Sequence, residues 1–384
     1  MGKKWSLEPT RRLLEEIGNP QEQFKVIHIG GTNGKGSVAA MVYQALCEAG
    51  FRVGLYTSPH LVEVRERIVV GDRPIGEEAF AAWTSRLRPA IEESEASFFE
   101  ATTAIALADF AARGAQVTVV EVGLGGRLDS TNVLEPVVTA VTNVGMDHTE
   151  YLGTTLPEIA AEKAGIAKPN IPFVIGESAG EAAAVLRDVA AGKGARVVEV
   201  PPEESYQGAL RLEGDHQRRN AAVATAVLHA LPAHLRPDAA AIAAGLANAW
   251  VPGRFDRRGR WIFDVAHNLA GMRVLARTLR DRPPPKPLHA VVGILRDKDA
   301  IGMVREIAGV ADGIWLTSPP SAPPDRRPDL DALAPALGSA VRVQADFDRC
   351  LDEAARGAQT VVVCGSFHTV GDAMMRVPGL APFG

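Results

Sequence analysis

The segment GGTNGKGS at residues 30–37 has the composition of a phosphate-binding loop. Its glycines let backbone N–H groups turn toward an anion, and Lys35 could reach the outer phosphates of a nucleotide. The hydroxyl of Ser37 could bind Mg²⁺, although Gly36 separates it from Lys35, whereas the usual loop has these two residue types adjacent. The alternative is a glycine-rich turn between a strand and a helix that binds no ligand.

Three further segments place polar side chains directly after apolar, β-branched runs. YTSPHL offers the hydroxyl of either Thr57 or Ser58, Glu121 begins EVGLGGRLD, and His148 lies in NVGMDH. Hydroxyl and carboxylate oxygens suit Mg²⁺, whereas histidine is a poor ligand for it. Each residue also has a structural explanation: an ordinary turn at Ser58, a strand-end carboxylate capped by Arg127, and a hydrogen-bonded histidine. The residues alone leave these alternatives open.

Lys163 lies in EKAGIAK, on a stretch with the spacing of an amphipathic helix. It is either a surface ion-pair partner, which contributes little to stability, or a buried amine with a lowered pKa. In the second half of the chain, three segments follow predicted strands: DVAHN (264–268), GILRDKD (293–299) and CGSFH (364–368). Three polar strand ends indicate one ligand-binding edge, but Asp and Ser at such positions are also good helix N-caps.

These segments belong to an alternation of short apolar runs and helix-like stretches, which predicts an α/β fold with mainly parallel sheets. The alternation breaks at VPG (251–253) and restarts after a charged stretch at 254–260. We therefore expect two domains, 1–253 and 254–384, with a ligand-binding cleft between them. The predicted strands are 24–29, 53–56, 117–122, 137–141, 173–175, 197–200, 261–265, 288–294, 313–317, 341–344 and 360–364.

Composition and charge argue against several classes of protein. The chain has 384 residues, 46% hydrophobic and 23% charged, with a formal net charge of −5 and no block of Lys and Arg. We therefore expect neither nucleic-acid nor membrane binding, and no apolar run reaches the about 18 residues of a membrane span. The N-terminus has no secretory pattern, so we expect a cytoplasmic protein. Cys47, Cys350 and Cys364 lack the spacing of a zinc site or a disulfide framework.

Nine segments together resemble the folylpolyglutamate synthase/dihydrofolate synthase family, a branch of the Mur ligase superfamily. They are GTNGKGS, YTSPHL, EVGLGGRLDSTN, GMDHTEYLG, EKAGIAK, GDHQRRNA, PGRF, DVAHN and GILRDKD. The resemblance implies a P-loop-type N-terminal domain like the central domain of Mur ligases and a smaller Rossmann-like C-terminal domain. It also implies an ATP-dependent ligase that activates a carboxylate as an acyl phosphate and then joins it to L-glutamate.

The resemblance assigns roles to individual positions. It implies ATP contacts from Thr32, Asn33, Gly34, Lys35, Gly36, Ser37, Asn220, Arg254 and Asp264. It implies substrate contacts from Phe99, Glu100, Thr102, Gly125, Gly126, Arg127, His267 and Ser366. It implies Mg²⁺ ligands at Ser58, Glu121, His148 and Lys163, with Lys163 carbamylated so that it could support a second ion. The residues expected to act in catalysis are Lys35, Lys163, Arg254 and His267.

The implied partners are small molecules: ATP, L-glutamate, and either a folate or dihydropteroate. We expect a monomer. Two alternatives remain, a peptidoglycan ligase of the Mur type and a catalytically inactive nucleotide-binding module. The segments YTSPHL and GLGGRLDSTN favour a folate enzyme over the first, and the presence of Lys35, Glu121, His148 and Asp264 argues against the second.

Overall fold

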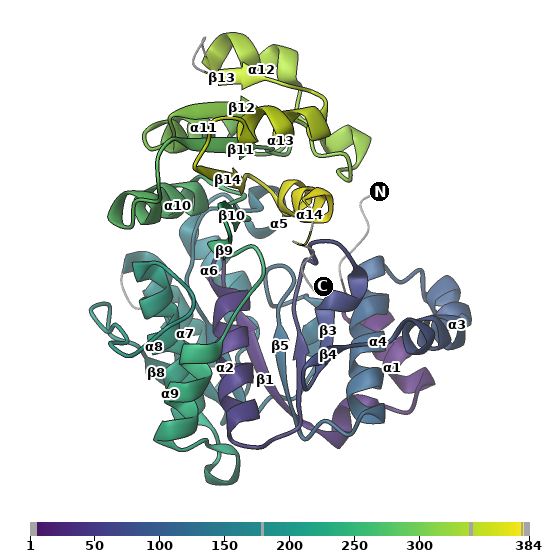
Figure 1. The fold of residues 1–384 in the computed structure, drawn as a ribbon. Helices are drawn as coiled ribbons and strands as arrows, with labels where there is room; N and C mark the ends of the chain where they lie inside the picture. The colour runs from purple at the N-terminus through teal and green to yellow at the C-terminus, as the bar shows by residue number, and fades with distance from the viewer. Residues whose placement is uncertain (1–5, 178–179, 338–340, 378, 380–384) are drawn as a thin grey trace. The chain divides into compact units, whose positions relative to one another are not determined.

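The computed structural model describes residues 6–177, 180–337, 341–377 and 379, and it confirms the α/β fold (Figure 1). The chain forms two compact units. Unit 1 comprises Met1–His60, Val64–Arg211 and Gln217–Trp250, and unit 2 comprises Leu61–Glu63, Leu212–His216 and Val251–Gly384. Among the described residues, no helix is both long and apolar enough to cross a lipid bilayer.

Unit 1 is built on an eight-stranded sheet in the order β4-β3-β2-β5-β1-β6-β7-β8. The strands are β1 (Lys25–Gly30), β2 (Val53–Tyr56), β3 (Ile68–Val70), β4 (Arg73–Pro74), β5 (Val117–Glu121), β6 (Val138–Val141), β7 (Pro172–Ile175) and β8 (Arg196–Glu199). All pairings are parallel except those of β3 with β2 and β4. Ile29 is in register with Glu121, so β1 and β5 end side by side.

Helices bury both faces of this sheet, as the nearly continuous apolar sequence of its central strands requires. They are α1 (Glu8–Glu16), α2 (Lys35–Glu48), α3 (Glu77–Ser94), α4 (Phe98–Ala112), α5 (Thr149–Leu152), α6 (Leu156–Ala164), α7 (Gly180–Gly192), α8 (Asp215–Ala230) and α9 (Ala239–Asn248). Single 3₁₀ turns are η1 (Pro20–Gln23), η2 (Val64–Arg67), η3 (Ser130–Val133) and η4 (Ala233–Leu235). Helices α1, α3 and α4 share one buried cluster, and α6 and α7 share another.

Unit 2 contains a six-stranded sheet in the order β13-β12-β11-β14-β10-β9. Its strands are β9 (Asp256–Arg258), β10 (Trp261–Asp264), β11 (Leu288–Val292), β12 (Gly313–Leu316), β13 (Val341–Val343) and β14 (Thr360–Cys364). Its helices are α10 (Leu269–Asp281), α11 (Ala300–Ala308), α12 (Leu330–Leu337), α13 (Phe347–Ala355) and α14 (Phe367–Arg376), with a 3₁₀ turn η5 (Pro324–Arg326). Only β9 is antiparallel to its neighbour among these pairings.

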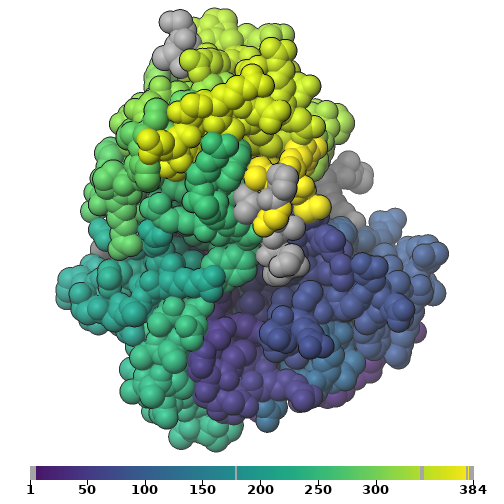
Figure 2. Space-filling view, viewed as in Figure 1, coloured from purple at the N-terminus to yellow at the C-terminus, as the bar shows by residue number. Residues whose placement is uncertain are grey.

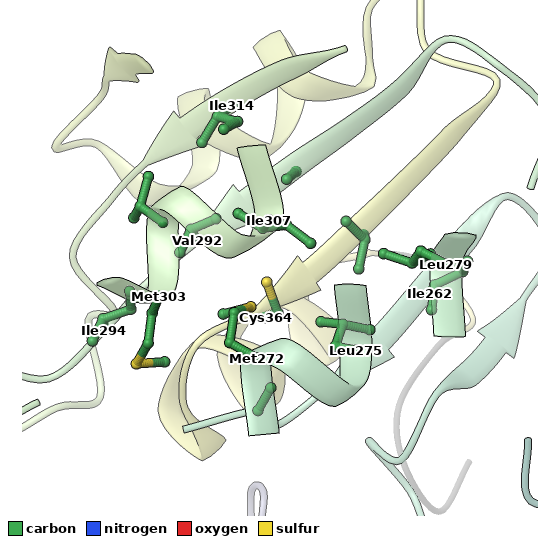
Figure 3. Packing of buried hydrophobic residues seen from close by; sticks show 14 of the residues in the cluster. Ile262, Met272, Leu275, Leu279, Val292, Ile294, Met303, Ile307, Ile314 and Cys364 are labelled. Carbon is green, nitrogen blue, oxygen red and sulfur yellow. The ribbon is translucent and has the colours of Figure 1, made fainter. Parts of the chain in front are cut away.

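In the described part of unit 2, one buried cluster lies between α10, α11 and the sheet (Figure 3), and another includes residues of α13 and α14. Met272 and Leu275 come from α10, Met303 and Ile307 from α11, and Cys364 from the end of β14. In the space-filling view, the yellow segment that includes α13 and α14 lies on the visible surface of the unit (Figure 2). The core holds the carboxyl ends of β10, β11 and β14 in fixed positions.

The strands predicted from the sequence are confirmed, with ends within two residues of those observed. Three short strands were missed: β3, β4 and β9. Each has two or three residues and pairs antiparallel, so none produces an apolar run long enough to recognise. In β9 the charged residues Asp256 and Arg258 bond each other at 3.0 Å, which explains how a strand forms within the charged stretch 254–260.

Candidate functional site

The loop between β1 and α2 has the geometry of an anion site. Its last residue, Gly34, has a φ of 81° and is the N-cap of α2, where it supplies no side-chain acceptor. A Cβ at Gly34 would lie 2.5 Å from Asn220 Oδ1, so only glycine fits between this loop and α8. The first N–H groups of α2, from Lys35, Gly36 and Ser37, are therefore available to an anion such as phosphate.

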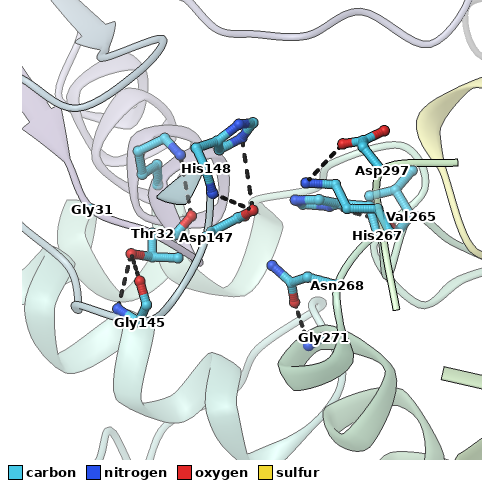
Figure 4. Close-up of polar contacts among 12 residues, drawn as sticks. Gly31, Thr32, Gly145, Asp147, His148, Val265, His267, Asn268, Gly271 and Asp297 are labelled. Carbon is cyan, nitrogen blue, oxygen red and sulfur yellow. Dashed lines mark hydrogen bonds and ion pairs between the residues drawn. The ribbon is translucent and has the colours of Figure 1, made fainter. Parts of the chain in front are cut away.

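A second loop, after β6, fixes the shape of this anion loop. Thr32 N donates to the carbonyl of Asn143 at 3.0 Å, and Asn33 N donates to Asn143 Oδ1 at 2.8 Å. The hydroxyl of Thr32 bonds the backbone of Gly145, as Figure 4 shows. The hydroxyl of Thr142 donates to the carbonyl of Asn33 at 2.7 Å. Thr32 and Asn33 thus hold the loop through contacts with a neighbouring strand end.

Glu121 lies where β5 ends and is buried, with 4% of its surface exposed. Its Oε1 is 3.8 Å from Lys35 Nζ, and its Oε2 accepts a hydrogen bond from Ser58 N at 3.1 Å. The interpretation of Glu121 as a carboxylate capped by Arg127 is wrong, because Arg127 pairs with Glu162 at 2.8 Å. A buried carboxylate beside the Ser58 segment and the anion loop has the oxygen chemistry that Mg²⁺ prefers.

Lys163 is buried, with 3% of its surface exposed, so the interpretation as a surface ion-pair residue is wrong. Its Nζ donates to the carbonyl of Gly31 at 3.0 Å. Burial, with a smaller contribution from the positive charge of Lys35, lowers the pKa of Lys163 to about 7. A substantial fraction of this amine is therefore neutral near pH 7, and only a neutral amine is nucleophilic.

His148 lies at the start of α5, in the left-handed conformation with a φ of 49°. Its backbone N–H donates to Asp147 Oδ1 at 2.9 Å, its ring Nε2 is 3.9 Å from the same oxygen, and its side chain is 43% exposed (Figure 4). Within the described ranges, no three His, Cys, Asp or Glu side chains form a preassembled metal cluster. Of the four predicted metal ligands, Ser58 and Glu121 are hydrogen-bonded to each other, and Lys163 is bonded to Gly31 of the anion loop. The backbone N–H of His148 donates to Asp147.

The predicted acceptor-substrate residues of α4 have different surroundings. The ring of Phe99 stacks on that of Tyr56, with 6.0 Å between centroids. Glu100 forms a capping box with Ser97 at the start of the helix. The Thr102 hydroxyl is buried and bonds the carbonyl of Phe98 at 2.9 Å. Glu100 and Thr102 therefore form hydrogen bonds within α4. Of the three predicted residues of this helix, Phe99 is the one that offers an aromatic ring to a ligand.

The glycine-rich loop 123–127 packs against the end of α6. A Cβ at Gly126 would lie 2.8 Å from the carbonyl of Glu162 and 2.9 Å from that of Lys163, which excludes any larger residue. Arg127 N donates to the Glu162 carbonyl at 2.9 Å. The loop that carries Gly125, Gly126 and Arg127 is therefore attached directly to the helical turn that carries Lys163.

Asp129 and Arg67 are among the buried polar groups of unit 1 that the sequence did not single out as site residues. Asp129 accepts hydrogen bonds from Leu124 N at 2.8 Å and Thr131 N at 3.0 Å. Arg67 is buried and donates to His60 Nδ1 at 2.9 Å, with its guanidinium 5.4 Å from the centre of the Phe98 ring. Asp129 had a signal, since it belongs to the segment EVGLGGRLD. Arg67 had no such signal, because it is the last residue of RER (65–67), which resembles an ordinary charged surface segment.

In unit 2, Asp264 ends β10 and accepts two backbone hydrogen bonds, from Phe255 N and Ala266 N, each at 2.9 Å. Burial raises the pKa of Asp264, and the positive charge of Arg254 with these two donors opposes the rise. The guanidinium of Arg254 lies 5.6 Å from the centre of the Phe367 ring. The His267 ring is also 5.6 Å from that of Phe367. Arg254, Asp264 and His267 thus surround one corner of the sheet.

The polar strand ends of unit 2 also serve as helix caps, which confirms that part of the sequence interpretation. Asn268 caps α10 by accepting from Gly271 N at 2.7 Å (Figure 4). Asp299 caps α11, and Ser366 caps α14 by accepting from Thr369 N at 3.1 Å. The three capped helices α10, α11 and α14 follow β10, β11 and β14, so their N-termini lie at the carboxyl edge of the sheet.

Two domain families match the chain. Residues 29–175 match the Mur ligase middle domain, and residues 253–367 match the Mur ligase, glutamate ligase domain. A curated relative from Haloferax volcanii, a probable bifunctional folylpolyglutamate synthase/dihydropteroate synthase, is 37% identical over 95% of this chain and 48% of its own length. The chain therefore spans about half the length of the first curated relatives it matches.

Two solved structures are similar over almost the full chain. The structure of E. coli FolC in complex with DHPP and ADP has a TM-score of 0.88 and 32% identity, covering 98% of this chain and 94% of that one. A bifunctional folylpolyglutamate synthase/dihydrofolate synthase from Yersinia pestis, complexed with AMPPNP and a Mn ion, has a TM-score of 0.86 and 31% identity. The match covers 98% of this chain and 94% of the Yersinia chain.

Proposed function

Because the chain belongs to the folylpolyglutamate synthase/dihydrofolate synthase family, we propose that it is an ATP-dependent ligase of folate metabolism. It adds L-glutamate to a folate, and to dihydropteroate, through an acyl-phosphate intermediate. The observation that carries this proposal is the Lys35–Glu121 pair beside the start of α2, whose N-terminal N–H groups have no side-chain cap.

The chemistry explains why such a site is needed. A carboxylate is a poor electrophile, so one of its oxygens first attacks the γ-phosphorus of ATP and ADP leaves. The neutral amino nitrogen of glutamate then attacks the acyl carbon and phosphate leaves. The nitrogen releases one proton to solvent and keeps the other as the amide N–H. Both steps concentrate negative charge on phosphoryl oxygens, so positioning and charge neutralisation supply most of the rate enhancement.

In unit 1, we assign Thr32, Asn33, Gly34, Lys35, Gly36, Ser37 and Asn220 to the nucleotide. The N-terminus of α2 supports this assignment, as does the contact that Gly34 makes with Asn220. Glu121, Ser58 and His148 would hold a divalent cation, which neutralises phosphate charge when bound. The buried carboxylate of Glu121 fits such an ion best, and the Mn ion in the Yersinia relative supports it.

Lys163 is the finer part of the metal assignment. A carbamate on its nitrogen would replace a buried cation by an anionic oxygen ligand, and it could support a second ion. The lowered pKa of Lys163 supports this modification, because carbon dioxide reacts with the neutral amine. The monomeric state and the cytoplasmic location expected from the sequence stay predictions.

In unit 2, we assign Arg254 and Asp264 to the nucleotide and His267 and Ser366 to glutamate. The grouping of Arg254, Asp264 and His267 around Phe367 supports these roles. Phe99, Glu100, Thr102, Gly125, Gly126 and Arg127 are assigned to the acceptor. Among these, the partly buried ring of Phe99, whose end lies close to Gly123, and the loop 123–127 support the assignment best.

Phosphate release tests the proposal. Purified protein with ATP, Mg²⁺ and L-glutamate should release phosphate with tetrahydrofolate, and more weakly or equally with dihydropteroate. Omission of glutamate should abolish sustained release. Release only with a UDP-muramoyl peptide would support the Mur-type ligase instead, which the comparisons do not favour. Release with none of these acceptors would support the inactive nucleotide-binding module.

A further inference from the structure

His28 is a fully buried histidine in the middle of the apolar strand β1. Its Nε2 lies 2.8 Å from the hydroxyl oxygen of Thr131, and its Nδ1 has no hydrogen-bond partner among the residues that the structure describes. Burial lowers the pKa of His28 to about 3, so the ring is neutral at physiological pH. An apolar residue here would avoid the free-energy cost of burying Nδ1 without a hydrogen bond. We therefore ask what the remaining hydrogen bond of His28 does.

That hydrogen bond is the first in a series. The Thr131 hydroxyl bonds Asp129 Oδ1, which also accepts from Thr131 N at 3.0 Å. Asp129 Oδ2 accepts from Leu124 N at 2.8 Å, and Asp129 N donates to the carbonyl of Gly126 at 3.2 Å. The series therefore runs from the interior of β1 to both ends of the glycine-rich loop 123–126.

The chemistry of the members fixes the direction of the series. Burial raises the pKa of Asp129, and the hydrogen bonds that it accepts from the Thr131 hydroxyl and from the N–H groups of Leu124 and Thr131 oppose this rise. As an ionised carboxylate Asp129 only accepts hydrogen bonds, and both of its oxygens already accept backbone N–H groups. The Thr131 hydroxyl must then donate to Asp129, so its oxygen accepts from His28. His28 is consequently the tautomer with its proton on Nε2. The other tautomer would bury an Nδ1–H with no acceptor, which is rarer in proteins than an unused acceptor.

We propose that His28 is a positioning residue for the acceptor substrate, acting through Thr131 and Asp129 on loop 123–126. This inference rests on the proposed function, in which that loop contacts the folate or pteroate. Four residues of the loop include three glycines, which have the largest conformational freedom of any residue type. The series of hydrogen bonds restricts the loop before substrate arrives, and such pre-organisation improves binding without a direct contact.

A merely structural role for His28 predicts a different pattern of kinetics. If the ring only fills space in β1, its loss would weaken the fold and affect ATP and acceptor alike. If it positions the loop, the KM for the acceptor rises while the KM for ATP stays unchanged, because the anion loop is held separately by Thr142, Asn143 and Gly145. The ratio of the two KM changes therefore separates the two roles.

Four single variants, with one double variant made from them, make this test. His28→Phe keeps the ring volume and removes the Nε2 donor, and Thr131→Val removes the next member. His28→Gln supplies an amide N–H at a similar reach and should restore the bond. Thr139→Val is the matched control, because Thr139 pairs with His28 in register on β6 and its buried hydroxyl donates to the carbonyl of Pro172 at 3.2 Å.

We expect His28→Phe and Thr131→Val to raise the KM for the acceptor about tenfold, with the KM for ATP within about twofold of wild type. His28→Gln and Thr139→Val should stay within about twofold of wild type for both. The double variant His28→Phe/Thr131→Val should be no worse than either single variant, since both interrupt one series. An unchanged acceptor KM in Thr131→Val, or equal increases for both substrates, would overturn the proposal.

Nitrogen-15 NMR of histidine-labelled protein tests the series without any turnover. The His28 ring, identified by the signals lost in His28→Gln, should keep its proton on Nε2 from pH 6 to pH 9, and Thr131→Val should shift its Nε2 resonance. A proton on Nδ1, or a resonance insensitive to Thr131→Val, refutes the series. Absence of phosphate release from wild type with the expected tautomer present would refute the proposed function alone.

Discussion

The ammonium nitrogen of Lys35 lies 3.8 Å from the carboxylate of Glu121, at the point where β1 and β5 end side by side. Neither group is fully exposed, with side-chain exposures of 16% for Lys35 and 5% for Glu121. Each charge therefore compensates the other, since an unpaired charge in a partly buried position would cost free energy. A nucleotide with a divalent cation could take over both roles, with phosphate beside Lys35 and the cation beside Glu121.

Replacement of Glu121 by Gln should reduce Mg²⁺-dependent phosphate release by about a hundredfold or more. The amide keeps the size of the side chain and can still accept from Ser58 N, but it removes the negative charge that a cation needs. The measurement is a Mg²⁺ titration of phosphate release, in which the half-saturating Mg²⁺ concentration should also rise.

Glu135→Gln is the matched control for that variant. Glu135 pairs with Lys168 at the same distance of 3.8 Å, but its side chain is 85% exposed and lies outside the assigned site. Its Mg²⁺ titration should overlay that of wild type. Wild-type rates in Glu121→Gln would remove Glu121 from the metal site.

Replacement of Arg254 by Ala should lower kcat/KM for ATP at least about tenfold, because a guanidinium forms strong charge-assisted hydrogen bonds with phosphate. Arg257→Ala is its control. Each of these arginines lies over a phenylalanine ring, Arg254 at 5.6 Å from Phe367 and Arg257 at 4.9 Å from Phe255. Steady-state kinetics of both variants separate a nucleotide contact from loss of packing. Equal effects in the two variants would argue against the assignment of Arg254.

The parts of the fold that the sequence predicts well are those with one dominant physical cause. The strand β5 is buried at every position from Val117 to Glu121, and its sequence is a run of β-branched residues that ends in one carboxylate. The strand β9 could not be found in this way, because Asp256 and Arg258 satisfy each other only once the strand has formed. Short antiparallel edges depend on such pairs and not on periodicity.

The residues of the candidate site also differ in whether local sequence or long-range contacts set their surroundings. Lys35 and Glu121 were recognisable because local motifs set their surroundings. The burial of Lys163 was not, since the carbonyl that it bonds belongs to Gly31, 132 positions earlier in the chain. His28 did carry a signal, because a lone histidine in the run KVIHIG needs a partner, but nothing local shows that the partner is Thr131. Long-range contacts of this kind need the folded structure.

Lys163 should form a carbamate when the protein is supplied with ¹³C-labelled bicarbonate. Its pKa of about 7 means that the neutral, reactive amine becomes the major form as the pH rises above 7, whereas an ordinary lysine stays protonated to about pH 10.4. Carbon-13 NMR should show a carbamate signal that grows between pH 6.5 and pH 8. Lys163→Ala should lose this signal, and Lys168→Ala should keep it. A signal absent from wild type at pH 8 would restrict Lys163 to its bond with Gly31.

Stability at acid pH should depend on His28. In the folded state its pKa is about 3, and in the unfolded chain it is about 6.5. Below pH 6.5 the unfolded chain therefore binds a proton that the folded protein does not, so stability falls as the pH decreases toward 3 and rises again with pH up to 6.5. The contribution of this one histidine is about 1.4 kcal/mol per pH unit inside that window.

Calorimetric unfolding of wild type and His28→Gln between pH 3.5 and pH 7 measures this contribution. The variant has no imidazole to protonate at this position, so its transition temperature should fall less steeply with acid. His216 supplies an internal reference, since burial lowers its pKa to about 4 and its own contribution ends there. Between pH 4 and pH 3.5 the difference between wild type and His28→Gln should keep growing, whereas that for His216→Gln should level off. Parallel profiles for wild type and His28→Gln would mean that His28 binds its proton equally in the folded and unfolded states, which would contradict its lowered pKa in the folded protein.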